Sequence, residues 1–325
     1  MSCTSFKVFV HSVAVIYGEA ISRYGFGGSH PLGTDRLQAF WSKFQSAGLD
    51  RSKNVRIEDP VLAEERVLLD FHTKTYVDFV KQASIVGTGF LDYGDTPAFP
   101  GVFEASSYVV GSTLLALDLV MKDKVDHAFN PIGGLHHAKR DVAGGFCVFN
   151  DIGIAIIAAR KNYNVKRIAY VDIDAHHGDG VFYEFDKDPL LFIADIHEDG
   201  KHLYPGTGFE HETGEGDAKG SKLNLPLKPL ATDDDFINAF NKVEEFIDNS
   251  KPELIILQCG ADGLKGDPIT HLQYSANAHK HATNVLHRIA HKHCNGRMIA
   301  LGGGGYNRNN IGDAWVEVVR ELIKS

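Results

Sequence analysis

The sequence predicts an α/β fold in which one doubly wound, mainly parallel sheet is flanked by helices. Short runs rich in β-branched residues alternate with segments of helical periodicity along the chain. This alternation is typical of parallel sheets whose strands are buried on both faces. The 325 residues contain no repeat, no low-complexity segment and no convincing linker. We therefore expect one domain that spans residues 1–325.

Six apolar runs are predicted as strands, at residues 8–16, 127–131, 167–173, 190–196, 254–258 and 297–301. The first run is interrupted by His11 and Ser12 and lacks a strongly basic lead-in, so a strand is favoured over a signal peptide. Helical spacing predicts helices at residues 106–122, 150–161, 233–249, 274–293 and 310–323. Ligands of such sheets bind beyond the carboxyl ends of the strands, so chemistry is expected directly after each run.

The composition excludes several classes of protein. Lys and Arg total 33 against 42 Asp and Glu, a formal charge of -9, so a nucleic-acid partner is not expected. The mean hydropathy is -0.16 and no apolar run approaches the roughly 20 residues of a membrane span, so no membrane partner is expected. The four cysteines show neither a C-x-x-C pair nor regular spacing, which favours a reducing cytoplasm over a disulfide framework.

Acidic residues and a histidine after two of the predicted strands form a candidate metal site. Asp172, Asp174 and His176 are spaced by two, so they project to the same side of an extended chain. Asp262 closes another strand in Gly-Ala-Asp-Gly. Two carboxylates and an imidazole with an open fourth position suit a catalytic zinc ion. The alternative is a capping aspartate beside a buried histidine that is satisfied by hydrogen bonds.

Adjacent histidines between glycines form the second candidate feature. His136 and His137 could both face one reacting group, and Asp172 and Asp179 could fix their tautomers by accepting ring N–H bonds. Two His–Asp pairs would result. On the alternative interpretation, these aspartates only cap loops or bind a structural cation.

The run from Gly302 to Gly305 leads to Tyr306. No Lys-Ser or Lys-Thr follows the run and no strand-linked G-x-G-x-x-G occurs, so neither a phosphate-binding loop nor a dinucleotide site is predicted. The glycines leave room for turns that bring Tyr306 close to a substrate, where its phenol could donate to a developing oxyanion. A tyrosine in such a loop can also serve only in packing.

Several longer motifs occur in order along nearly the whole chain: Tyr24-Gly25-Phe26-Gly27, His30-Pro31 with Arg36, His136-His137-Ala138-Lys139, Gly145-Phe146-Cys147, Asp172 to Gly180, Leu203-Tyr204-Pro205-Gly206-Thr207-Gly208, Gly260-Ala261-Asp262 with Gly266-Asp267-Pro268, and Gly302 to Asn307. With these motifs the sequence resembles the zinc-dependent histone deacetylase family, and within it the prokaryotic branch called acetoin utilization proteins. The resemblance implies the arginase/deacetylase fold and a hydrolase that removes acetyl or related acyl groups from acyl-lysine in proteins or peptides.

The same resemblance implies roles for individual residues. One zinc ion would be held by Asp174, His176 and Asp262. A water would be activated between the metal and His137, with His136 as electrostatic partner and Tyr306 on the carbonyl oxygen. The substrate channel would be formed by Phe146 and Tyr204 as aromatic walls, with Gly145, Ile269, Asp95 at the rim, and Arg36 near an acetate-release cavity. Members of the family also bind K⁺ near Asp172 and the end of the strand at Asp195. A small hydroxyl residue is expected there, but this chain has an aspartate. A structural K⁺ site is therefore left open.

Other functions are weighed against this one. An acetylpolyamine is the alternative substrate, and the oligomeric state cannot be read from the sequence. A binuclear manganese ureohydrolase would also carry the sequence Asp-Ala-His, which is found here at Asp174-Ala175-His176. Such an enzyme needs a further aspartate to bind its second metal ion, and Gly178 occupies that position in this chain. A non-enzymatic binding protein on the same fold would be expected to lose a ligand, a paired histidine or the tyrosine.

Two charged or polar runs on predicted helices are given no catalytic role. On the helix at 274–293, His287 and His291 lie one turn apart and could chelate a metal, but a solvated helix surface is favoured and no function is assigned. The run from Asp233 to Asp235 is expected to complement the dipole at a helix N-terminus.

Overall fold

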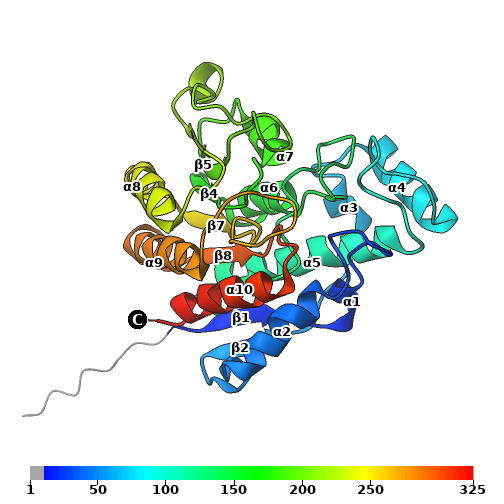
Figure 1. The fold of residues 1–325 in the computed structure, drawn as a ribbon, viewed down its shortest axis with the longest axis horizontal. Helices are drawn as coiled ribbons and strands as arrows, with labels where there is room; N and C mark the ends of the chain where they lie inside the picture. Colours follow the sequence, from blue (N-terminus) through cyan, green and yellow to red (C-terminus); the bar gives the residue numbers. More distant parts are fainter. Residues whose placement is uncertain (1–10, 325) are drawn as a thin grey trace, which may run out of the picture.

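Eight strands form one sheet in the order β2-β1-β3-β8-β7-β4-β5-β6, and every neighbouring pair is parallel (Figure 1). The computed structural model describes residues 11–324. The strands are β1 (Val13–Ile16), β2 (Val55–Glu58), β3 (His127–Asn130), β4 (Ile168–Asp172), β5 (Leu191–Glu198), β6 (Lys222–Leu227), β7 (Leu254–Gln258) and β8 (Met298–Leu301). This arrangement confirms the predicted fold class.

Helices cover both faces of the sheet. They are α1 (Glu19–Ser22), α2 (Arg36–Ser46), α3 (Glu65–Leu68), α4 (Lys74–Val86), α5 (Val102–Met121), α6 (Asp151–Tyr163), α7 (Asp179–Phe182), α8 (Asp233–Ser250), α9 (Ala276–His293) and α10 (Arg308–Leu322), with short 3₁₀ turns η1 (Leu49–Arg51), η2 (Tyr183–Phe185) and η3 (Gly216–Ala218). Helices α2, α10, α9 and α8 lie in succession along one face (Figure 1). Helix α5 packs on β1, β3 and β8 and lies beside α6. Helix α8 begins at the acidic run with a capping box between Thr232 and Asp235, as the sequence predicts.

The four central strands position the site. Every residue of β3, β8, β7 and β4 is buried, because helices cover both faces. Their register aligns Asn130 with Leu301, Leu301 with Gln258, and Gln258 with Asp172. The carboxyl ends of these four strands therefore stand at one level, and the loops that follow them meet there.

The structure adds two strands that the sequence analysis did not predict, β2 and β6. Both form edges of the sheet and carry half-exposed or polar positions, so neither has a continuous apolar run. The strand predicted at 8–16 is observed from Val13, and its residues 8–10 lie outside the described part. Helices α2 and α4 were also not predicted.

Helix α5 is the one described helix that is long and apolar enough, by length and composition alone, to cross a membrane. Of its most apolar 18-residue window, 67% is buried inside the protein. Buried serines Ser106 and Ser107 donate to backbone carbonyls one turn earlier. These features are those of a core helix, so α5 is weak evidence for a membrane span.

Candidate active site

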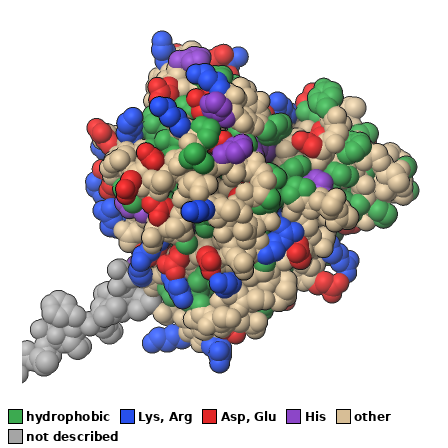
Figure 2. Space-filling model, viewed as in Figure 1, with side chains coloured by type: hydrophobic (Ala, Val, Ile, Leu, Met, Phe, Trp, Pro, Cys, Tyr) green, Lys and Arg blue, Asp and Glu red, His purple; other side chains and the backbone are tan. Residues whose placement is uncertain are grey.

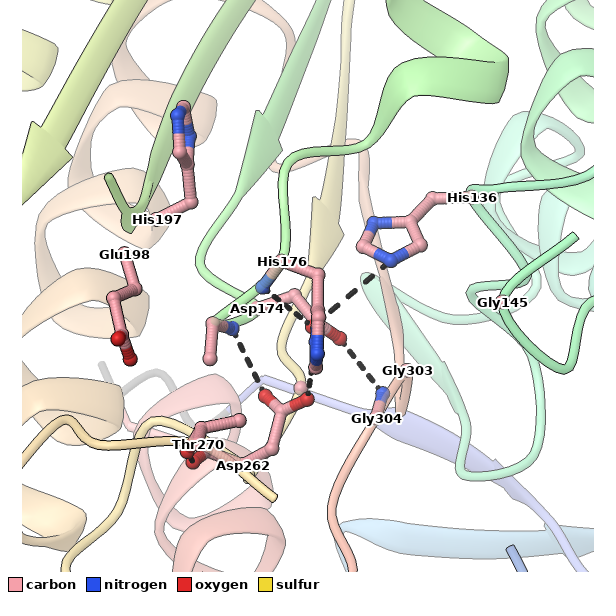
Figure 3. Close-up of polar contacts among 12 residues, drawn as sticks. His136, Gly145, Asp174, His176, His197, Glu198, Asp262, Thr270, Gly303 and Gly304 are labelled. Carbon is pink, nitrogen blue, oxygen red and sulfur yellow. Dashed lines mark hydrogen bonds and ion pairs between the residues drawn. The ribbon is translucent and has the colours of Figure 1, made fainter. Parts of the chain in front are cut away.

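Loops after the four central strands bring together the residues that the sequence analysis singled out (Figure 3). The loop after β4 carries Asp174 and His176, and the loop after β7 carries Asp262. The loop after β3 carries the two adjacent histidines, and the loop after β8 is the glycine run that ends at Tyr306. Residues from distant parts of the chain thus meet at one edge of the sheet.

Asp174, His176 and Asp262 form a buried group that could hold a metal ion. Nδ1 of His176 lies 3.1 Å from Oδ1 of Asp174 and 3.0 Å from Oδ2 of Asp262. Burial opposes protonation of His176, but the hydrogen bonds of both carboxylates outweigh burial and raise its pKa to about 10. Burial and the charge of Asp174 raise the pKa of Asp262 to about 7. The pocket therefore favours a positive charge between the two carboxylates.

Hydrogen bonds hold both carboxylates in place. Oδ2 of Asp174 accepts from Gln258 Nε2 at 2.7 Å and from the Gly304 N–H at 2.8 Å. Oδ1 of Asp262 accepts from the Ala175 N–H at 2.9 Å. A Cβ atom at Gly304 would lie 2.3 Å from Oδ2 of Asp262, so this position has no room for a side chain. The backbone itself thus forms one wall of the metal-binding group.

The two adjacent histidines each pair with an aspartate. Nδ1 of His136 lies 2.7 Å from Oδ2 of Asp172, and Nδ1 of His137 lies 2.7 Å from Oδ1 of Asp179. Their environments drive the two pKa values apart. Burial opposes protonation of His136, but the charges of Asp172 and Asp174 raise its pKa to about 9. Burial and the charge of His136 lower the pKa of His137 to about 4.

At neutral pH, His136 is therefore protonated and His137 is neutral. Because Nδ1 of each ring is bound to an aspartate, Nε2 is the nitrogen left for chemistry. Nε2 of His136 lies 3.9 Å from Oδ1 of Asp174. Two titratable groups with opposite pKa shifts in one buried site are typical of acid–base catalysis.

Tyr306 follows the glycine run and is held there by Asp267 and Arg36. Oδ2 of Asp267 accepts from the Tyr306 N–H at 2.9 Å. The buried Arg36 guanidinium donates to the carbonyls of Gly303 and Gly305, the former across a short contact. Burial raises the pKa of the Tyr306 phenol well above its usual value, so the hydroxyl stays a hydrogen-bond donor at neutral pH. In the structure, Arg36 therefore fixes the loop that carries Tyr306.

A cavity of about 300 Å³ opens onto His137, with Tyr204, Asp95, Asp92 and Tyr93 among its lining residues. The Tyr204 ring lies 5.0 Å from the ring of His137. A Cβ atom at Gly145 would lie 2.3 Å from the His137 ring, and its φ is +49°, so this backbone requires glycine.

Phe146 and Ile269 are not among the residues that line this cavity but lie near Tyr306 and its loop. The ring of Phe146 meets that of Tyr306 edge-on at 5.8 Å, so it lies beside the predicted oxyanion donor. The Ile269 N–H donates to Asp267 at 3.1 Å, which places this residue in the loop that also holds Tyr306.

Comparisons with known proteins identify the family. Residues 30–322 match the model of the histone deacetylase domain. The chain is 38% identical to the acetoin utilization protein AcuC of Bacillus subtilis (strain 168) over 319 residues, which is 94% of this chain and 81% of that protein. It is 34% identical to AcuC of Staphylococcus aureus (strain MSSA476), over 95% of this chain and 81% of that protein. The chain belongs to the histone deacetylase family.

A solved structure supports the same conclusion. The crystal structure of the HDA15 HD domain superposes with a TM-score of 0.89 at 26% identity, over 96% of this chain and 88% of that one. The resemblance inferred from the sequence motifs is thereby confirmed, and family membership supports deacetylase chemistry for this chain.

In this histone deacetylase family member, some supporting residues escaped the sequence analysis. Buried Asp151, at the start of α6, accepts the N–H groups of Gly134 and Leu135 and so fixes the turn before His136. Gln258, Asp267 and Tyr170 also bind site residues. Gln258 is the polar last residue of a buried strand, and Asp151 belongs to the polar pair that follows an apolar run. This pattern marks their positions in the sequence but not the contacts that they make.

Asp195 lies beside the deacetylase-family site, next to Asp172 in the sheet register. Its Oδ1 lies 2.6 Å from Nδ1 of His197, and its Oδ2 accepts from the Gly178 N–H at 2.9 Å. Despite burial, the charge of Asp195 raises the pKa of His197. The contact with Asp195 therefore favours the charged form of His197, and K⁺ binding stays a prediction.

Proposed function

We propose that this chain is a zinc-dependent deacetylase that hydrolyses the side-chain amide of acetyl-lysine in proteins or peptides. One observation carries the proposal: a buried Asp–His–Asp group lies beside two histidines whose pKa values are driven apart, and one of these, His137, lines a small cavity. Family membership supports the deacetylase chemistry.

The residues present fit one zinc ion. Asp174, His176 and Asp262 each offer one ligand atom, and these atoms all lie within 4.8 Å of one another. When bound, zinc polarises the amide carbonyl and lowers the pKa of a water from 15.7 to about 7. A Cβ atom at Gly178 would lie 2.6 Å from Oδ2 of Asp172, so the aspartate that a second manganese would need does not fit at this position. This crowding supports a mononuclear site over a ureohydrolase site.

His137 is the proposed general base and acid. Its Nε2 is unprotonated at neutral pH, because burial and the neighbouring charge of His136 lower its pKa to about 4. It can take a proton from the attacking water and return it to the leaving amine. Asp179 holds the ring in the required tautomer through Nδ1.

His136 and Tyr306 are proposed to stabilise negative charge. His136 carries its proton at neutral pH and faces the Asp174 side of the site. The Tyr306 hydroxyl donates to the carbonyl oxygen as that oxygen becomes anionic. Both donors are held before the substrate arrives, which is the arrangement in which fixed dipoles stabilise a transition state most strongly.

The channel residues favour a neutral acyl amide on an unbranched alkyl chain. Tyr204 supplies aromatic surface beside His137, and Phe146 supplies it beside Tyr306. A free lysine ammonium would lose its hydration at the metal without an anionic partner, so the acylated form should be strongly preferred.

The mouth of the cavity supports a peptide substrate over an acetylpolyamine. Hydrophobic side chains gather over α4 and the loop that follows it (Figure 2), including exposed Phe79, Ile85, Val86, Phe90 and Tyr93. Of these, Tyr93 lines the cavity. A second carboxylate, Asp92, lines the cavity together with Asp95. Oδ1 of Asp92 accepts the N–H groups of residues 94, 95 and 96. That carboxylate is therefore occupied by its own loop.

Replacing Asp95 with asparagine tests the choice of substrate. Partial burial and the neighbouring Asp92 raise the pKa of Asp95 to about 7, so Asp95 gains its charge as the pH rises through 7. For acetyl-lysine peptides, KM of the wild type is expected to fall over that pH range, and KM of Asp95→Asn to stay flat. Steady-state kinetics on both substrate classes measure this. Asp234→Asn, on the exposed first turn of α8, is the control. A much higher kcat/KM for acetylpolyamines, lost in Asp95→Asn, would overturn the peptide assignment.

Removing one metal ligand tests the zinc assignment. Asp262→Asn is expected to lose one equivalent of zinc together with nearly all activity, because it removes a ligand and a charge from a three-ligand site. Metal analysis of the purified proteins and assays before and after chelation and zinc return measure both effects. Full activity after exhaustive chelation, or loss of two ions in Asp262→Asn, contradicts a mononuclear zinc enzyme.

A further inference from the structure

Four histidines gather at the end of the sheet opposite to the candidate active site. His11 precedes β1, His127 is the first residue of β3, and His287 and His291 lie in the last turns of α9. These are the amino ends of the strands, and Figure 1 shows the start of β1 and helix α9 on the same side of the molecule. The group, which we call the four-histidine cluster, thus shares no residue with the active site.

The structure corrects the expectation that this part of α9 is only a solvated surface. The side chain of His287 is buried, with 5% of the residue exposed. Its ring lies 4.8 Å from that of His127, 4.6 Å from that of His291 and 5.1 Å from that of His11. The sequence could not show this, because two of the four rings come from the starts of strands far away in the chain.

The spacing within the cluster fits a metal ion. One ring nitrogen each of His11, His127 and His291 lies within 4.8 Å of the other two. Nε2 of His127 lies 3.3 Å from Nε2 of His291. Tetrahedral zinc with Zn–N bonds of about 2.0–2.1 Å separates its ligand nitrogens by about 3.3 Å. The two closest nitrogens therefore already stand at the distance that one ion would impose.

The surroundings of the cluster also suit a cation. Oδ1 of Asp126 lies 3.8 Å from Nδ1 of His11, which places negative charge beside the group. Nε2 of the buried His287 has no hydrogen-bond partner among the described residues. An unpaired buried nitrogen is unfavourable, and it lies next to the three candidate ligands.

We propose that His11, His127 and His291 form a second metal site for a divalent transition ion such as zinc. Imidazole is a preferred ligand of zinc, copper and nickel, and no thiolate or oxygen-rich group is needed. His287 packs against all three rings and stands where it closes the site from the interior. The ion would join the starts of β1 and β3 to the end of α9. This proposal does not depend on the proposed catalytic function.

Zinc titration of tag-free enzyme that already holds its catalytic zinc tests the second site. The wild type is expected to bind one more zinc at micromolar free zinc, measured by equilibrium dialysis and metal analysis. His11→Gln and His291→Gln, at two partly exposed positions, are expected to weaken this second binding by about tenfold or more, because each removes one of three ligands. His281→Gln, on the same helix but outside the cluster, should keep it.

Two further measurements separate the sites. Asp262→Asn is expected to keep the second zinc and lose the catalytic one, whereas His291→Gln should keep deacetylase activity. Zinc should also raise the melting temperature of the catalytically loaded wild type but not that of loaded His291→Gln, since binding to the folded state alone stabilises it. A wild type that binds no zinc beyond the catalytic ion overturns the proposal. The proposal is also overturned if His11→Gln and His291→Gln bind the second zinc as strongly as the wild type does.

Discussion

Tyr306→Phe is expected to lower kcat by about 10²–10³-fold, equivalent to about 2.7–4 kcal/mol, while KM changes little. The lost hydroxyl donates to an oxygen that carries full negative charge only in the transition state, so binding of the ground state is barely affected. Burial keeps this phenol protonated at neutral pH, and a donor is therefore lost at every working pH. Steady-state kinetics on an acetyl-lysine peptide measure the effect, with zinc content determined on the same sample.

The matched control for this variant is Tyr163→Phe. This variant likewise removes one tyrosine hydroxyl. The Tyr163 hydroxyl, at the end of α6 and away from the site, donates to Asp118. Its kcat should equal that of the wild type. Near-normal turnover of Tyr306→Phe with zinc still bound would show that the phenol has no role in the reaction.

His137→Ala is expected to lower kcat by about 10²–10⁴-fold, because it removes the group that moves the proton from water to the leaving amine. Zinc content should be retained, since His137 is not among the three proposed zinc ligands. His202→Ala, an exposed histidine outside the site, is the control. Activity of His137→Ala close to that of the wild type would remove His137 from the mechanism.

The pH profile supplies an independent test of the same role. The charge of His136 lowers the pKa of His137, so His136→Gln should let that pKa rise. The reaction needs neutral His137. As the pH is lowered, the activity of His136→Gln should therefore begin to fall at a higher pH than that of the wild type. An unchanged acidic limb in His136→Gln would mean that another group controls it.

The sequence predicted the central part of the fold because buried parallel strands are continuous apolar runs. β4 and β7 are such runs. At the edges of the sheet, β2 has only exposed and half-buried positions, and β6 mixes buried with half-buried positions and includes polar residues, so neither carries a comparable signal. Helix α4 is a short amphipathic element on the periphery, and its spacing was not recognised.

The candidate site was predicted as far as its chemistry depends on residue type and spacing. Asp174, His176 and Asp262 follow strand ends, and a parallel sheet brings such ends together. Residues such as Gln258 and Asp151 could not be assigned, because they act through hydrogen bonds to particular backbone and side-chain atoms. Those contacts exist only once the loops are packed, and no spacing along the chain encodes them.

The distance along the chain between the residues proposed to bind the metal has a consequence for the order of folding. His176 and Asp262 are 86 residues apart, and β7, which leads to Asp262, pairs with β4 only after that intervening segment has closed on itself. Closing a loop of this length costs about 4 kcal/mol of chain entropy beyond a constant. Parallel pairing of distant segments is intrinsically slow. A nascent chain that has made only β1 to β6 carries Asp174 and His176 but lacks Asp262. The three-residue group is therefore complete only in the last stage of assembly, and an ion that needs all three residues would stabilise only that stage.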